Sequence, residues 1–226
     1  ITILLGFQWE NIQFTNAEKD LLPDDNIVNI EYQNFIKTFG DEGNLIVIAI
    51  KDKKFFTPKT FGAWQNLLSD IKKDKQIEMV LSVSDLQKLT KNDVEQRFDL
   101  KNYVNKNRIS SQTYLDSIKA DLFANMPFYE GLLFNKKTQT IRAAIYMDKA
   151  IVNTPERKAY ILEDFNKKIA NFEEQNNIKV HISGMPYIRT MNAKSIADEI
   201  GLFVLGAIFI TSLIFFFFFR SHRATL

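Results

Sequence analysis

Residues 200–219 form a run of twenty residues without a charged side chain, which ends on five consecutive phenylalanines. An α-helix rises 1.5 Å per residue, so this run is about 30 Å long as a helix, the thickness of the hydrocarbon core of a bilayer. The run contains fifteen Leu, Ile, Phe and Val residues, and each contributes about −0.3 to −0.6 kcal/mol to insertion. The sequence therefore predicts a transmembrane helix within residues 190–219 rather than a buried core helix.

The charges that flank this run predict its orientation. Arg220 and Arg223 follow it, whereas Asp198 and Glu199 precede it. Positive residues mark the cytoplasmic end of a membrane span. We therefore expect residues 220–226 to begin a cytoplasmic loop and residues 10–196 to lie on the opposite side. The span contains no carboxylate, so no proton-coupling residue is expected in it.

The composition excludes several kinds of site. The chain carries 29 basic and 27 acidic residues, which leaves no basic field of the kind that nucleic-acid binders use. It contains no cysteine, so it has neither disulfides nor thiolate metal ligands. His181 and His222 are its only histidines, and they are too far apart in the sequence to indicate a metal site. We expect no catalytic, cofactor or metal site, and no enzyme.

The region before the span contains two strand–helix–strand patterns. Residues 44–50 are a continuous branched apolar run, typical of a covered strand. Thr57 and Pro58 then predict the start of a helix, and residues 77–83 predict the returning strand. The predicted helix has one apolar face, formed by Phe61, Trp64, Leu67, Leu68 and Ile71.

The second pattern repeats this order. Residues 140–147 predict a strand, Thr154 and Pro155 the start of a helix, and residues 179–183 the returning strand. The apolar face of the second helix is expected to comprise Leu162, Phe165, Ile169 and Phe172. Two such units in series predict an α+β domain of the duplicated βαβ, ferredoxin-like type, with helices on one face of a mostly antiparallel sheet.

This pattern divides the chain into segments. We expect a connecting segment at residues 10–43, the ferredoxin-like domain at 44–187, and a helical insertion at about 84–128. Within the insertion, residues 110–125 are amphipathic and predict a helix capped by Ser110 and Ser111, whereas residues 88–107 are polar and predict exposed helical turns. Residues 131–134 are expected to form a hairpin with residues 140–147. Residues 1–9 are apolar and are interpreted as the end of a preceding transmembrane helix, the alternative being a first strand.

Several motifs resemble the resistance-nodulation-division (RND) transporters, in particular the branch of the mycobacterial membrane protein large (MMPL) and Patched-like permeases. Residues 184–189 (GMPYIR) resemble the junction into the second transmembrane helix of that family, and residues 220–224 (RSHRA) its basic loop. Residues 21–25 (LLPDD) and 31–43 resemble the segment that leads from the first span to the first strand. The resemblance covers nearly the whole chain.

The resemblance implies a segment of a proton-driven bacterial inner-membrane permease that exports hydrophobic or amphipathic substrates such as lipids or drugs. It makes residues 44–187 the first extracytoplasmic porter domain. Gly184, Pro186 and Arg189 would then form the junction between the porter domain and the membrane, with Arg220 and Arg223 as its cytoplasmic flank. The implied partners are the bilayer, the other spans, a second porter domain, the substrate and further copies of the chain. The alternatives are a membrane-anchored extracytoplasmic sensor and a protein-export accessory of the SecDF type.

Overall fold

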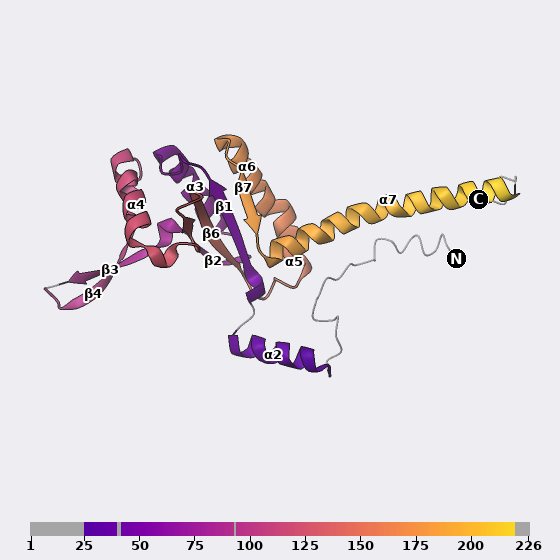
Figure 1. The fold of residues 1–226 in the computed structure, drawn as a ribbon, viewed down its shortest axis with the longest axis horizontal. Coiled ribbons are helices and arrows are strands. Elements are labelled where there is room, and N and C mark those ends of the chain that lie inside the picture. The colour runs from indigo at the N-terminus through magenta and orange to yellow at the C-terminus, as the bar shows by residue number, and fades with distance from the viewer. Residues whose placement is uncertain (1–24, 40–41, 93, 220–226) are drawn as a thin grey trace. The chain divides into compact units, whose positions relative to one another are not determined.

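The computed structural model describes residues 25–39, 42–92 and 94–219. The chain divides into two compact units. The first, here called the body, is Pro23–Ile188, and the second contains the described part of Arg189–Leu226. The expected α+β class is confirmed, because the body combines antiparallel sheets with helices and is followed by one long apolar helix (Figure 1). Residues 1–9, the first part of the connecting segment and residues 220–226 lie outside the described residues.

The main sheet of the body is antiparallel at every described pairing. Its strands are β1 (Leu45–Lys51), β2 (Ile77–Leu81), β5 (Phe134–Asn135), β6 (Thr140–Met147) and β7 (Val180–Ser183). They pair in the order β2-β6-β1-β7, and the short β5 pairs with β6. Each of the four longer strands lies where the sequence predicts a strand. The expected hairpin is also present, although its first strand begins only at Phe134.

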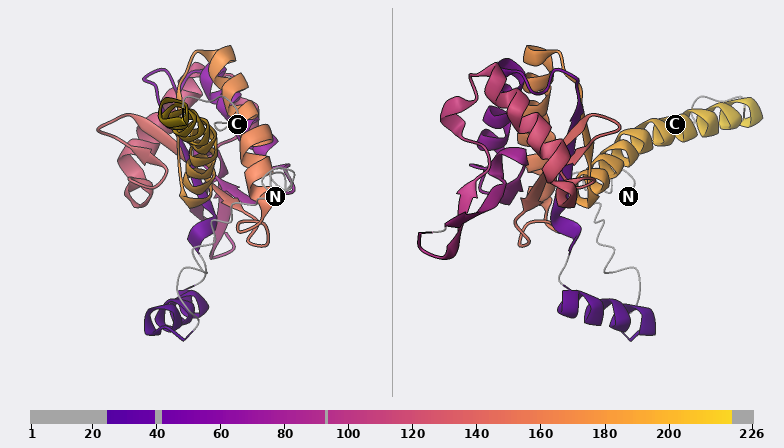
Figure 2. Two further views of the ribbon diagram at one scale, coloured as in Figure 1. Left: turned by 90° about the vertical axis from the view of Figure 1, so that its right-hand side faces the viewer. Right: turned by 60° about the vertical axis from the view of Figure 1, so that its left-hand side comes forward.

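One face of this sheet carries the core. Burial alternates along β1 and β6, so that every second side chain is enclosed. The enclosed residues belong to one cluster with those of α3 (Pro58–Ile71) and α6 (Asn166–Asn176). All five apolar residues predicted for the face of α3 are buried in it. Figure 2 shows these helices beside the sheet from two further directions.

The connections from β1 to α3 and from β6 to α5 (Pro155–Ala159) have the same local structure. Asp52 and Asp148 follow the two strands, and each carboxylate accepts a backbone N–H two residues later, at 2.7 and 2.8 Å. Thr57 and Thr154 then precede the two helices, and each hydroxyl donates to the carbonyl three residues earlier, at 2.9 and 2.8 Å. Pro58 and Pro155 occupy the first helical position. The two threonines thus precede their helices as expected, but neither side chain caps a helical N–H.

The insertion after β2 differs from its prediction in one part. Residues 88–107, expected as helical turns, contain a two-stranded antiparallel ribbon of β3 (Gln87–Asn92) and β4 (Arg97–Asn102). The amphipathic helix is confirmed as α4 (Gln112–Asn125), and Ser111 caps it by accepting the N–H of Tyr114. Short 3₁₀ turns join these elements: Val83–Asp85, Lys106–Arg108 and Pro127–Tyr129. The ribbon extends from the body in Figure 1.

The second crossover helix is interrupted by a π-helical turn, Tyr160–Phe165, between α5 and α6. A π turn adds a residue to the helical repeat, so the buried face shifts. Tyr160 and Ile161 are buried in place of Leu162, which is only half-buried. The prediction for Leu162 was therefore wrong, whereas Phe165, Ile169 and Phe172 are buried as expected.

A helix α2 (Ile27–Phe39) occupies part of the segment predicted as a connection before β1. A 3₁₀ turn, Glu42–Asn44, leads into β1, and the buried Asn44 amide donates to the carbonyl of Met147 at 2.9 Å. This bond ties the start of β1 to the end of β6.

A cluster of polar side chains joins the end of α3 and the turn after it to the π turn and α6. The Lys168 ammonium lies 2.6 Å from a carboxylate oxygen of Asp74 and 3.2 Å from one of Asp70. The hydroxyl of the buried Tyr160 donates to Asp74 at 2.8 Å. Burial and this bond to Asp74 raise the pKa of Tyr160. Burial alone would lower the pKa of Lys168, but the bonds to the two carboxylates outweigh it and raise that pKa.

We expect the free energy of unfolding to fall as the pH rises above about 10, the ordinary tyrosine pKa. In that range the unfolded chain releases the Tyr160 proton, whereas the folded chain retains it until its raised pKa is reached, so folding becomes less favourable. Tyr160→Phe removes this proton and should flatten the decline between pH 9 and 11 in urea unfolding curves. Tyr129→Phe is the matched control, because the Tyr129 hydroxyl has no hydrogen-bond partner among the described residues. Equal declines in both variants would contradict the assignment.

Candidate functional site: the strand-to-helix junction

Gly184 is the single residue between β7 and α7 (Met185–Phe219). Its φ of 121° lies in a region that side-chain-bearing residues rarely adopt. Its carbonyl accepts the N–H of Ile188 at 3.0 Å, the first bond of the helix. Pro186 is the second helical residue, where a backbone N–H would have no helical partner. Both residues therefore direct the chain from strand into helix without an intervening loop.

Gly184 also lies against the backbone of β1. A Cβ atom added there would overlap the carbonyl oxygen of Leu45 and lie 2.8 Å from the Cα of Ile46. Those atoms are main-chain atoms of a central strand, which cannot move aside as a flexible side chain could. The position requires glycine for two reasons: its positive φ, and the close contact of its Cα with the β1 backbone, which leaves no room for a Cβ atom.

The first turn of α7 contacts the π-helical turn. The ring centroids of Tyr187 and Phe165 lie 6.3 Å apart, and the two rings meet edge to face. Phe165 is fully buried. Glu173 lies in α6. Its carboxylate accepts the N–H of Val180 at 2.6 Å, at the start of β7. The junction is thus held from β1, from the π turn and from α6.

Sequence reasoning placed only part of this junction. It identified Gly184 and Pro186 but gave no role to Tyr187, Phe165 or Glu173. Spacing of three and four residues did indicate that Phe165 is buried, yet nothing local indicates that it meets Tyr187. Arg189 lies in α7, at the start of the second unit, while Arg220 and Arg223 lie outside the described residues.

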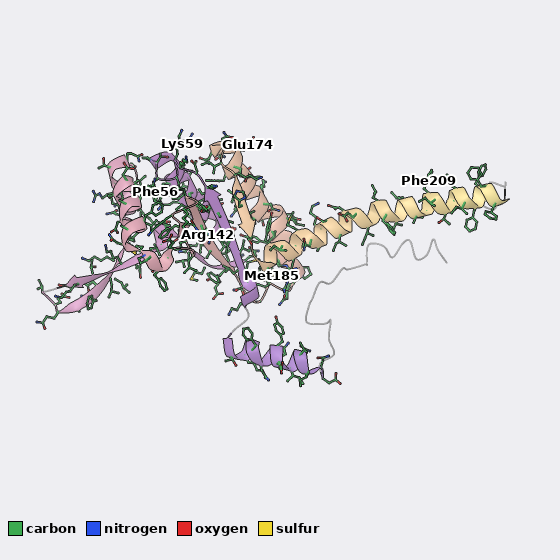
Figure 3. The ribbon with its side chains drawn as sticks, viewed as in Figure 1. Phe56, Lys59, Arg142, Glu174, Met185 and Phe209 are labelled. Carbon is green, nitrogen blue, oxygen red and sulfur yellow. The ribbon has the colours of Figure 1, made fainter. Side chains whose placement is uncertain are left out.

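α7 is long and apolar enough to cross a membrane, which is consistent with membrane association. Its 35 residues correspond to about 52 Å of helix, and its most apolar stretch has a mean hydropathy of 2.6 with none of it buried. Side chains stand out along its length, Phe209 among them, in Figure 3. The helix begins five residues earlier than expected, so residues 185–189 are helical too, and Lys194 and Asp198 are paired at 2.5 Å within it.

The described residues hold no group of three or more histidine, cysteine or acidic side chains that could bind a metal ion. His181 lies in β7 with its side chain exposed, and His222 lies outside the described part of the chain. The junction consists of a close glycine contact, ring packing and the start of a helix. No model of a known protein family matches the sequence, and no curated protein matches it either.

Proposed function

We propose that the chain is a segment of an RND permease of the MMPL and Patched-like branch in a bacterial inner membrane. In this proposal the body is a porter domain on the extracytoplasmic side, and α7 is the second transmembrane helix. The observation that carries the proposal is the order β2-β6-β1-β7 in a sheet whose last strand runs directly into a membrane-length apolar helix.

The strand order supports a ferredoxin-like domain. Within the main sheet, β1-α3-β2 and then β6, the second crossover and β7 follow one another in the chain, with the insertion between them. In the sheet, β1 lies between β6 and β7, and β6 between β2 and β1, all antiparallel. This is the arrangement expected when two βαβ units interlock. The matching Asp–Thr–Pro connections described above favour an origin of the two units by duplication.

The second face of the main sheet is evidence that another domain packs against it. Leu45, Val47, Ala144 and Tyr146 alternate with the buried core residues of β1 and β6 and are only half-buried. A half-buried sheet face that is largely apolar, although it also carries Thr140 and Arg142, is suited to packing against another domain. In the proposed permease that domain is the second porter domain.

In this proposal the body binds and releases the substrate, and the junction passes movements of the body on to the membrane helix. By resemblance the substrates are hydrophobic or amphipathic, such as lipids or drugs. Movement of the body would reach the membrane through Gly184 and the first turn of α7. Since residues 200–219 carry no ionisable side chain, proton coupling belongs to other spans.

Sequencing of the coding region on both sides provides the first test. We expect four further apolar spans after α7, a carboxylate within the fourth, and then a second extracytoplasmic region with the same βαβ order. A stop codon shortly after Leu226 would contradict the permease and favour a membrane-anchored sensor.

A deletion strain provides the functional test. We expect loss of the gene to raise accumulation of a lipid precursor or a hydrophobic drug inside the cell, and the intact gene to restore export. A matched secretion assay distinguishes a protein-export accessory, whose loss would impair secretion of reporter proteins and leave drug accumulation unchanged. That second result would overturn the proposal.

A further inference from the structure

A polar cleft lies in the body at the C-terminal end of α3. It consists of two adjoining cavities of about 190 and 560 Å³. Both cavities are lined by Lys72, Ser84, Asp85 and Lys106. Lys72 follows the last residue of α3, while Ser84 and Asp85 lie in the 3₁₀ turn after β2. Lys106 opens the 3₁₀ turn that follows the ribbon, so three separate segments meet at the cleft.

The two lysines of the cleft form no ion pair within 4.0 Å among the described residues, although the Asp85 carboxylate lines the same cavities. By contrast, Lys168, Lys88 and Lys136 each lie within 4.0 Å of a carboxylate. An unpaired ammonium beside a concave surface attracts an anion, because the low-dielectric wall weakens screening by solvent.

The walls add uncharged donors. Gln65 lines the smaller cavity, and its side-chain nitrogen is enclosed without a hydrogen-bond partner among the described residues. Gln65 can therefore donate to a ligand only after its side chain turns toward the cavity. The larger cavity is lined by three asparagines, Asn102, Asn105 and Asn107. The Asn105 side-chain oxygen already accepts the N–H of Asn107 at 3.0 Å, which leaves its NH₂ group free to donate.

Asp85 adds a negatively charged hydrogen-bond acceptor to the cleft. One of its carboxylate oxygens accepts the Ser82 hydroxyl at 2.5 Å, and its side chain lines both cavities. A carboxylate disfavours a bare anion but accepts a hydroxyl or an ammonium group. The cleft therefore combines donors for an anion with an acceptor for a polar group beside it.

We infer that this cleft binds a phosphate group that carries a small hydroxyl- or amine-bearing substituent, with Lys72 and Lys106 toward the phosphate and Asp85 toward the substituent. The same chemistry occurs in free phosphorylated alcohols and in phospholipid headgroups. The inference is independent of the proposed transport function, since a sensor could use the same cleft.

Titration calorimetry on the full chain in detergent micelles tests the soluble ligand, with glycerol 3-phosphate as the probe and glycerol at the same concentration as the reference. We expect saturable binding that weakens as salt rises. Lys72→Gln and Lys106→Gln should each weaken it about tenfold, the usual effect of losing one charge-assisted hydrogen bond. Lys73→Gln is the matched control, because Lys73 is an exposed neighbour that does not line either cavity.

The lipid source is tested with the chain in nanodiscs. The sequence lacks cysteine, so Lys73→Cys accepts a single environment-sensitive fluorophore beside the cleft without replacing a residue that lines it. A fluorescence change with phosphatidylglycerol that is absent with phosphatidylcholine, and is lost in Lys106→Gln, would support the headgroup as ligand. Binding of glycerol 3-phosphate alone would support the soluble ligand. Absence of both, or equal weakening in Lys73→Gln, would overturn the inference.

Discussion

Replacing Gly184 with alanine should lower the free energy of unfolding of the body by about 2–6 kcal/mol. Two costs add at this position. The φ of 121° is strained for any residue with a Cβ, which costs about 1–3 kcal/mol. The new methyl group would also overlap the carbonyl of Leu45 and approach the Cα of Ile46, and overpacking of this kind costs about 1–3 kcal/mol further. Urea unfolding of the chain in detergent micelles, followed by the fluorescence of the buried Trp64, measures the sum.

Two other glycines separate these costs. Gly131 has a φ of 87° but no atom within 4 Å of its added Cβ, so Gly131→Ala carries the backbone cost alone. Gly62 lies inside α3 with open space and no positive φ, and Gly62→Ala should stabilise the body by about 0.5–1 kcal/mol. If Gly184→Ala were no more harmful than Gly131→Ala, the close contact with β1 would be wrong. The expected loss of stability thus decreases from Gly184→Ala to Gly131→Ala, and Gly62→Ala should be stabilising. Measuring all three variants tests the contact at the junction.

The parts of the fold that were predicted correctly depend on local pattern. The strand at β1 is a continuous apolar run, and the face of α3 follows a spacing of three and four residues, so both could be read from neighbouring residues. Gly184 and Pro186 were recognisable because their backbone restrictions are intrinsic to the residue types. The apolar run of α7 was recognisable for the same reason, since length and composition alone determine whether a helix can cross a bilayer.

The parts that were missed depend on tertiary contacts. The ribbon carries little apolar pattern, because Leu89 is the only apolar residue of β3, and Phe98 and Leu100 are the only ones of β4. Both leucines are exposed, so burial does not enforce the pattern either. The π turn begins and ends on the buried residues Tyr160 and Phe165, whose rings lie 6.1 Å apart between centroids, and no residue pattern in the sequence predicted it. The ring contact between Phe165 and Tyr187 joins residues on separate elements, which no periodicity predicts.

Two arginines within the apolar part of α7 should abolish stable membrane integration. The fifteen Leu, Ile, Phe and Val residues of the run together favour insertion by about 4.5–9 kcal/mol, at about 0.3–0.6 kcal/mol each. An arginine near the centre costs about 2.5–3.5 kcal/mol and removes one of those contributions. The double variant Phe209→Arg, Leu213→Arg therefore cancels most or all of the favourable free energy, whereas Phe209→Arg alone leaves part of it.

Alkaline carbonate extraction of cell membranes measures the outcome as the fraction of chain that stays in the membrane pellet. We expect the unsubstituted chain to be retained, Phe209→Arg to be retained in part, and the double variant to be released. The control exchanges the same two residues, Phe209→Leu with Leu213→Phe, which preserves composition and should preserve retention. Protease resistance of the body in each variant ensures that release reflects failed insertion and not unfolding, because the substitutions lie in the second unit of the chain. Full retention of the double variant would mean that contacts other than the apolar run hold the chain to the membrane, and α7 would then no longer explain membrane association.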